Sequence, residues 1–174
     1  MFPPLQQFGL NDATDADAVL NALSAQFQIR SEAETALRRI YYDSFDWRLY
    51  LSGGVLYSKP DGRKKMLVWS KEKSTGSSEN LMPVRSMPKF VCDLPQGAMR
   101  DKLSRLLGMR ALLPQVEIKG RVQLFRVLDE EQKTVLRFSL ESCASRASGV
   151  GEYRELQARI GLLPMRGYNS ILKQ

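Results

Sequence analysis

The chain has 174 residues and is 43% hydrophobic, which is enough for one domain with a sizeable core and argues against wholesale disorder. It has no histidine and only two cysteines, Cys92 and Cys143, so Ser-His-Asp and Cys-His catalysis and imidazole- or thiolate-based zinc sites are excluded. The net charge of +7 favours polyanionic partners: polyphosphate, a nucleotide, nucleic acid or an anionic membrane surface.

No stretch of the sequence has the features of a membrane span or of a secretory signal. The apolar runs fall well short of the roughly 20 consecutive residues that cross a bilayer. The start, Met1-Phe2-Pro3-Pro4, has no basic segment followed by an apolar one. Two isolated cysteines are typical of buried thiols in a reducing compartment. We therefore expect a cytoplasmic protein that does not enter a membrane.

The first 46 residues predict a strand, a helix and a second strand. Residues 5–10 (LQQFGL) are short and partly alternating, which indicates a strand. Thr14-Asp15-Ala16-Asp17 has the form of a helix capping box. The apolar residues that follow have helical spacing: Val19, Leu20, Leu23 and Phe27. Residues 36–42 are rich in β-formers and end at the turn-like cluster Asp43-Ser44-Phe45-Asp46.

A hairpin and a polar loop come next. Residues 55–59 and 63–71 form its two arms, and Pro60-Asp61-Gly62 forms the turn between them. Residues 63–65 (RKK), beside the hairpin turn, are expected to form an exposed basic surface. Residues 72–80 (EKSTGSSEN) are small and polar, which predicts a loop.

The rest of the chain predicts further strands and one helix. Residues 95–107 have helical spacing, with Gly108 placed as a C-terminal cap, and the glycine-rich segment 145–152 predicts a loop. The expected strands are residues 82–87, 89–92, 115–128, 133–141 and 153–160. Several hairpins with few helices indicate an antiparallel α+β domain.

The last long hairpin has one charged and one apolar side. Lys119 and Arg121 share one side of its first strand, and Arg137 and Glu141 share one side of its second. A charged side of this kind either faces solvent or lines the inside of a water-filled barrel. The residues alone leave both explanations open.

One stretch, 41–53 (YYDSFDWRLYLSG), resembles the tyrosine-aspartate turn, arginine-leucine pair and glycine of CYTH domains, in the form that precedes a CHAD domain. Weaker similarities are spread along the chain, at 94–97 (LPQG), 109–114 (MRALLP), Lys119-x-Arg121 and 163–168 (LPMRGY). The resemblance implies a CYTH-like domain over residues 1–163. It also implies a linker-like tail, 164–174, that leads to a CHAD domain in a longer protein.

CYTH membership implies an antiparallel β-barrel of about eight strands with a few flanking helices and a charged tunnel inside. In that family, basic side chains bind a triphosphate-like chain, and acidic side chains at the tunnel ends bind Mg²⁺ or Mn²⁺. The physical logic is that arginine and lysine neutralise closely spaced phosphates, while carboxylates are suited to magnesium. The implied partners are inorganic polyphosphate or a nucleoside triphosphate, beside a C-terminal CHAD domain.

The sequence departs from the pattern of catalytic CYTH proteins. Their first strand carries an ExExK motif, whereas residues 5–10 contain no acid and no lysine. The Leu-Arg-x-Arg expected after the glycine falls on Leu56-Tyr57-Ser58-Lys59, which keeps one charge of two. We therefore expect no catalytic residues and no cofactor, with Mg²⁺ or Mn²⁺ required only for a residual hydrolase.

The best candidates for anion contacts are basic residues on predicted strands: Arg39, Lys59, Lys65, Lys119, Arg121 and Arg137. Because Arg38 and Arg39 are adjacent, they point to opposite faces and only one can serve. Glu141 and Glu155 are weak candidates for a metal site. Asp43 is expected to shape the turn after its strand, and the tryptophans and tyrosines to pack in the core and across strands.

Four functions compete. The preferred one is a non-catalytic, degenerate CYTH-like module that binds polyphosphate or another phosphate-rich anion. The alternatives are a metal-dependent triphosphate or polyphosphate phosphohydrolase with residual activity, a nucleic-acid-binding β domain, and a purely structural barrel. The missing ExExK strand counts against the hydrolase, and an outer face of basic and aromatic residues would favour nucleic acid.

Overall fold

The computed structural model describes residues 6–10, 13–71 and 80–165. Their backbone divides into two compact units, each described by itself. Among the described residues, the first unit comprises 6–10, 13–37, 119–144 and 154–165, and the second comprises 38–71, 80–118 and 145–153. No helix in the described residues is long and apolar enough to cross a membrane.

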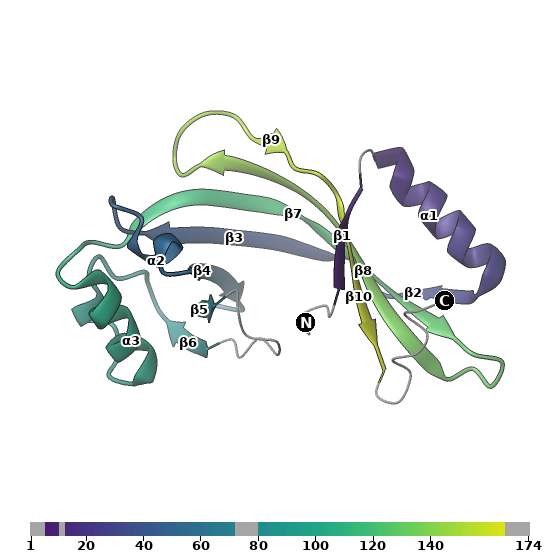
Figure 1. Cartoon of the computed structure of the whole chain (residues 1–174), viewed down its shortest axis with the longest axis horizontal. Coiled ribbons are helices and arrows are strands. Elements are labelled where there is room, and N and C mark those ends of the chain that lie inside the picture. Colours follow the sequence, from purple (N-terminus) through teal and green to yellow (C-terminus); the bar gives the residue numbers. More distant parts are fainter. Residues whose placement is uncertain (1–5, 11–12, 72–79, 166–174) are drawn as a thin grey trace. The chain divides into compact units, whose positions relative to one another are not determined.

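The described elements are ten strands, three α-helices and one 3₁₀ turn (Figure 1). In chain order they are β1 (Gln6–Gly9), α1 (Ala13–Gln26), β2 (Gln28–Ser31), β3 (Thr35–Asp43), α2 (Arg48–Leu51), β4 (Gly54–Asp61), β5 (Lys64–Lys71), β6 (Asn80–Val84), the 3₁₀ turn Val91–Asp93, α3 (Ala98–Leu107), β7 (Leu113–Leu128), β8 (Thr134–Ala147), β9 (Arg154–Glu155) and β10 (Arg159–Pro164).

All ten strands belong to one sheet, whose order is β1-β10-β8-β7-β3-β4-β5-β6, with β2 also paired to β7 and β9 to β8. The pairs β1–β10, β10–β8, β2–β7, β3–β4, β4–β5 and β5–β6 are all antiparallel. The expected antiparallel α+β class is therefore confirmed. The expected closed barrel of about eight strands is corrected, because among the described residues no pairing joins β6 to β1 and the sheet is open.

In the first unit, α1 covers one face of the sheet. Val19, Leu20 and Leu23 of α1, at the spacing that predicted the helix, pack against a core that includes Phe125 and Phe138. These two rings stack with centroids 4.7 Å apart and planes 11° apart. The helix begins at Ala13, before Thr14, so the predicted capping box does not mark its start; the side chains of Thr14 and Asp15 are outside the described part of the structure.

In the second unit, α3 packs against β4, β5 and β6. Met99, Leu103 and Leu107 of α3 are buried in one core with Leu56 and Leu67 of the hairpin. Gly108 ends the helix with φ 59°, as its predicted role as a C-terminal cap requires. The hairpin turn is shorter than expected, because β4 continues to Asp61 and β5 begins at Lys64.

Several sequence predictions are wrong in detail. Residues 89–92 form a single bridge from Phe90 and the start of a 3₁₀ turn, not a strand. The strand expected at 153–160 is two short strands, β9 and β10, and β8 continues to Ala147 into the expected loop. Neither β2 nor α2 was predicted. Cys92 is exposed, and Cys143 is half-buried. The loop expected at 72–80 lies almost entirely outside the described residues.

Candidate anion-binding site

Three arginines of the first unit project from the sheet face opposite α1. Because Phe125 and Phe138 face α1, their chain neighbours Arg126 and Arg137 point to the other side. Arg159 joins them, since Leu162 pairs with Phe138 and residue 159 has the opposite orientation to residue 162 on β10. We call Arg126, Arg137 and Arg159 the arginine face.

Within the arginine face, Arg137 is the residue whose hydrogen bonding is least complete. Its Nε atom is buried and has no hydrogen-bond partner among the described residues. Arg126 has a partner, because its Nε lies 2.8 Å from Glu32 Oε1, although the angle is not that of a directed hydrogen bond. A buried donor without an acceptor is costly, and a bound anion is one of the usual reasons for its presence.

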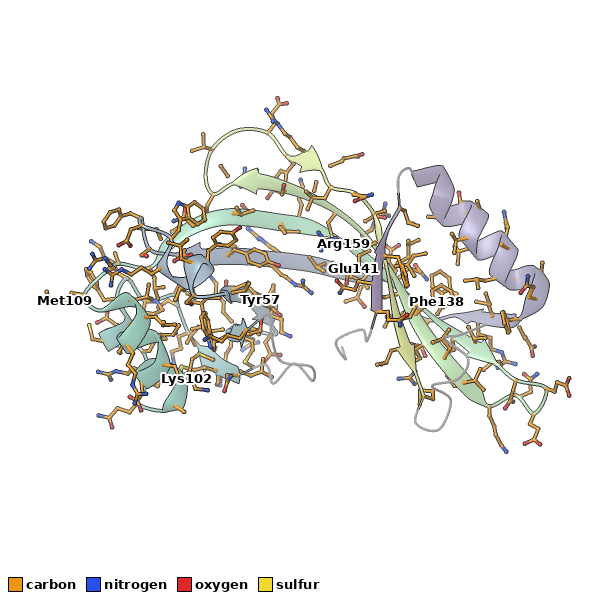
Figure 2. All side chains as sticks on the ribbon, viewed as in Figure 1. Tyr57, Lys102, Met109, Phe138, Glu141 and Arg159 are labelled. Carbon is orange, nitrogen blue, oxygen red and sulfur yellow. The ribbon has the colours of Figure 1, made fainter. Side chains whose placement is uncertain are left out.

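Arg159 lies directly across from Glu141 in the pairing of β10 with β8, and Figure 2 shows the two side by side. Arg159 is exposed, whereas Glu141 is half-buried. An arginine next to an acid retains part of its capacity for phosphate because a guanidinium has five N–H donors. The arginine face is thus basic overall, with three guanidinium groups and the carboxylates of Glu32 and Glu141.

The second unit carries a smaller basic pair on the sheet face opposite α3. The pairing of β3 with β4 brings Ile40 opposite Ser58 and Tyr41 opposite Tyr57. Continuing this register by one residue places Arg39 opposite Lys59. The Arg39 guanidinium lies 5.2 Å from the centre of the Tyr57 ring, a cation–π distance. Arg38 points to the other face, where it forms an ion pair with Glu117. Of the two adjacent arginines, Arg39 is therefore the one that lies on the same face as Lys59.

The six predicted anion-binding residues are distributed over both units: Arg39, Lys59 and Lys65 in the second, and Lys119, Arg121 and Arg137 in the first. Lys65 is exposed near the end of β5, on the face of buried Val84. Lys119 and Arg121 are exposed on the side of β7 that carries Phe125, opposite to Arg137. Arg121 is 72% exposed and lies 3.6 Å from Glu34.

The acids that could hold a metal do not fit one in the described part of the chain. Glu141 is half-buried on β8, and Glu155 is exposed on β9. No group of three or more His, Cys, Asp or Glu side chains that could hold a metal ion occurs in the described residues. A magnesium or manganese ion needs several oxygen ligands at one point, so no chemical step is assigned to a metal here.

A buried acid in the second unit was not predicted. Arg146 donates to Glu117 Oε2 at 2.7 and 3.0 Å, and Arg38 donates to Oε1 at 2.8 and 3.2 Å. The hydrogen bonds from Arg146 and then from Arg38 outweigh the effect of burial and lower the Glu117 pKa to about 2. Glu117 therefore stays ionised at neutral pH and ties together β3, β7 and β8.

The turn after β3 is organised by Asp43, as predicted. Its carboxylate accepts hydrogen bonds from the backbone N–H groups of Ser44, Leu49 and Tyr50 at 2.7 to 2.9 Å. These bonds hold the short helix α2 against the strand end, and they occupy both carboxylate oxygens. Asp43 is thus a structural residue of the turn and not a base.

Beside Asp43, Asp46 forms a second acid–arginine cluster. Burial raises the pKa of Asp46, but hydrogen bonds from Ser44, Arg48 and Arg110 hold it well below its usual value. Its Oδ2 atom lies 2.8 Å from Arg110 Nε and 3.0 Å from Arg48 Nε. The two arginines share this one carboxylate, so the cluster keeps one net positive charge although both guanidinium groups are engaged. The arginine face is the better anion candidate, because the buried Nε of Arg137 has no acceptor in the described residues.

The chain matches no protein-family model and no curated protein sequence. Solved structures do resemble it, and two of them are described here. A proposed adenylate cyclase from Bacillus halodurans aligns with 97% of this chain and 82% of its own, at 12% identity and a TM-score of 0.56. A proposed adenylyl cyclase from Hippeastrum, with a dominant triphosphatase activity, aligns with 96% of this chain and 81% of its own, at 12% identity and a TM-score of 0.54. At this identity the likeness shows the fold, and it supports the CYTH-like fold that residues 41–53 predicted.

Proposed function

We propose that this chain binds a linear phosphate-rich anion, a triphosphate or a longer polyphosphate, without hydrolysing it. The observation that carries the proposal is Arg137, whose buried Nε has no acceptor in the described residues, between Arg126 and Arg159 on one sheet face. A CYTH-like fold is consistent with this function, because the Hippeastrum protein of similar fold has triphosphatase activity.

The physical basis is the match between charge spacing and ligand. Arg159 pairs with Glu141, four residues along β8 from Arg137, so the backbones of these two arginines are about 14 Å apart. Their long side chains can reach toward each other, and a linear chain of several phosphates can extend between them so that each guanidinium group binds a different phosphate. Charge-assisted hydrogen bonds from arginine to phosphate are about twice as strong as neutral ones. A single phosphate would use only part of such a face.

Phosphohydrolysis is the second candidate. The triphosphatase activity of the Hippeastrum protein is the observation that favours it. Against it, the described residues offer only Glu141 and Glu155 as candidate ligands, and no cluster of three. The proposed role beside a CHAD domain remains a prediction from the resemblance, as does the choice of inorganic polyphosphate over a nucleotide.

Exchange of two arginines tests the proposal. We expect Arg137→Gln combined with Arg159→Gln to weaken tripolyphosphate binding at least about tenfold, because each lost charged hydrogen bond contributes roughly 1 kcal/mol or more. Binding is measured by calorimetry at several salt concentrations, with Mg²⁺ present and phosphate release followed in parallel. Circular dichroism and the melting temperature show whether the variant is folded.

The matched control is Lys119→Ala combined with Arg121→Ala, which also removes two positive charges but from the opposite face of the first unit. If anion binding weakened only in this control, the anion site would lie on the α1 side of the sheet. Metal-dependent release of phosphate would show that the protein hydrolyses the anion. Single-stranded RNA bound as tightly as polyphosphate, or no binding of any of these anions, would overturn the proposal.

A further inference from the structure

The second unit carries a cluster of large apolar side chains that its core leaves in solvent. Met109 is 93% exposed and Leu51 is 76% exposed, and three aromatic residues of the turn around α2 are exposed as well. We call these five residues the apolar patch: Phe45, Trp47, Tyr50, Leu51 and Met109. A single exposed apolar residue is ordinary, but several gathered in one place are typical of an interaction surface.

The two segments that form the patch are joined through a pair of arginines. The Arg110 guanidinium lies 5.8 Å from the centre of the Phe45 ring, and Met109 is its neighbour in the chain. Arg48 donates to a carbonyl oxygen in the last turn of α3 at 3.4 Å, and Leu51 follows three residues later on the same flank of α2. Figure 2 shows Met109 at the end of α3, pointing outward. The patch is therefore one surface and not several scattered residues.

The turn fixes the conformation of the patch. Trp47 has φ 54° and ψ 37°, in the left-handed region that a large side chain seldom adopts. This conformation is held because Trp47 N–H donates to the Ser44 carbonyl and the Trp47 carbonyl accepts from Leu51 N–H. Trp47 and Tyr50 were expected to pack in the core or across strands, and neither is buried there. Backbone strain that keeps a ring in solvent favours a functional reason for its position, and a fixed surface loses little entropy on binding.

The residue types of the patch favour a protein partner. Tyrosine, tryptophan, phenylalanine, methionine and arginine are enriched in the cores of protein–protein interfaces, and lysine is depleted there. The patch has all three aromatic types and a methionine, and its two cations, Arg48 and Arg110, are arginines. These are also the residue types that contribute most of the binding energy at such interfaces.

The arrangement of the rings does not favour a nucleic acid strand. Bases stack on rings whose flat faces are open. Trp47 and Tyr50 instead meet edge to face, with ring centres 6.4 Å apart, and the guanidinium of Arg110 lies over the Phe45 ring. The most exposed residue of the patch is Met109, which offers no surface for stacking.

The charges around the patch select an acidic partner. Arg48 and Arg110 share the carboxylate of Asp46, so this cluster keeps one net positive charge. Helix α3, whose end adjoins the patch, adds three basic residues and one acid. The whole chain has a net charge of +7, so a second copy of it would bring like charges to the interface. A segment rich in aspartate or glutamate complements this surface.

We propose that the apolar patch docks an acidic segment of a partner protein, whose leucine or aromatic side chains cover Leu51 and Met109 and whose carboxylates pair with Arg48 and Arg110. Asp46 accepts from the Nε of each arginine, and a guanidinium group has five N–H donors, which leaves further N–H groups for a partner. The docking surface and the arginine face belong to different units, so this inference goes beyond the anion-binding proposal and does not depend on it.

Selection from a peptide library tests the proposal. Random peptides of about 12 residues, displayed on phage, are selected on the full chain and counter-selected on the double variant Leu51→Ser with Met109→Ser. We expect the enriched peptides to combine aspartate or glutamate with leucine or an aromatic residue. The most enriched peptide, made synthetically and measured by calorimetry, should bind the double variant at least about tenfold more weakly. The same peptide with its acids changed to amides should bind wild type at least about fivefold more weakly, and added salt should reduce that difference.

The matched control is Leu81→Ser combined with Val150→Ser, which removes two exposed apolar side chains of the same unit outside the patch. It should change the affinity for the peptide by less than about twofold. Because all four positions are exposed, both double variants should melt within about 2 °C of wild type. The comparison of the acidic peptide with its amide form uses wild type alone, so it tests the charge argument even if a variant is unstable.

Four results would overturn the proposal. The first is an absence of peptides that depend on the patch, and the second is enrichment of peptides without acidic residues. The third is single-stranded RNA, or vesicles containing phosphatidylserine, that bind wild type more tightly than the best peptide and lose affinity with Leu51→Ser and Met109→Ser. The fourth is a dimer in sedimentation experiments that these two substitutions dissociate, which would assign the patch to contacts between copies of the chain.

Discussion

Replacing Gly54 with alanine is expected to destabilise the protein by about 3 kcal/mol, because the added methyl group overlaps a buried ring. A Cβ atom at this position would lie 2.0 Å from the nearest ring carbon of Trp69 and within 2.8 Å of two others. Trp69 is 3% exposed and belongs to the core that packs against α3, so its ring cannot move aside without disturbing that core. Urea denaturation followed by circular dichroism measures the loss.

Two further variants make this test specific. Gly53→Ala changes the neighbouring glycine, whose φ is 69° but whose Cβ would meet nothing within 4 Å, and should cost only about 1 kcal/mol from backbone strain. Trp69→Leu removes the ring that causes the overlap. The double variant Gly54→Ala with Trp69→Leu should therefore be more stable than the sum of the single effects by about 1 kcal/mol or more. Strict additivity would show that the overlap is not the cause.

The elements that the sequence predicted well are those whose side chains alternate between core and solvent over a long run. The helices α1 and α3 are of this kind: burial of one face gives the helical spacing that the sequence shows. The β4–β5 hairpin was predicted instead by its turn residues, because Leu67, Val68 and Trp69 of β5 are buried in succession. The short β2 has four residues, too few for a pattern to distinguish it from a loop.

The turn around α2 shows where periodicity is insufficient. Trp47 and Tyr50 have the composition of core residues, but they are exposed because the local backbone is fixed by hydrogen bonds to Asp43 and not by burial of aromatic rings. The role of Asp43 could be predicted from its place after a strand. The left-handed Trp47 could not, since the sequence has no glycine or asparagine there to signal it.

The basic site was predicted in part for a similar reason. Arg39, Lys59 and Arg137 were singled out because they fall on strands, whereas Arg126 and Arg159 were missed. Arg159 was placed on one long strand, but the chain forms two short ones, and its orientation becomes clear only from the pairing of β10 with β8. The register between strands that are far apart in the sequence depends on tertiary packing. The alternation of residues within a single strand gives no information about that register.

Replacing Glu117 with glutamine is the second change expected to have a large effect on stability, a loss of about 2 kcal/mol at pH 7. The carboxylate is 6% exposed and accepts from two guanidinium groups, one on each oxygen. A glutamine side chain can accept from one arginine, but its NH₂ group faces the other, so one set of charged hydrogen bonds is lost. Arg38 is 63% exposed and can return to water, which limits the loss compared with a fully buried ion pair.

The same residue predicts a specific dependence on pH. The pKa of Glu117 is lowered from 4.5 to about 2 in the folded protein, so the unfolded chain takes up the proton first as the pH falls. The stability that the ionised carboxylate contributes is therefore complete above pH 4.5 and is lost between pH 4.5 and 2. Asp46 has a lowered pKa as well and adds its own acid sensitivity, but it does so equally in wild type and variant.

The difference in unfolding free energy between wild type and Glu117→Gln, measured by urea denaturation from pH 7 down to pH 2.5, should thus be constant to about pH 5 and then shrink. A difference that stayed constant to pH 2.5 would mean that the charge of Glu117 is not what ties β3, β7 and β8 together.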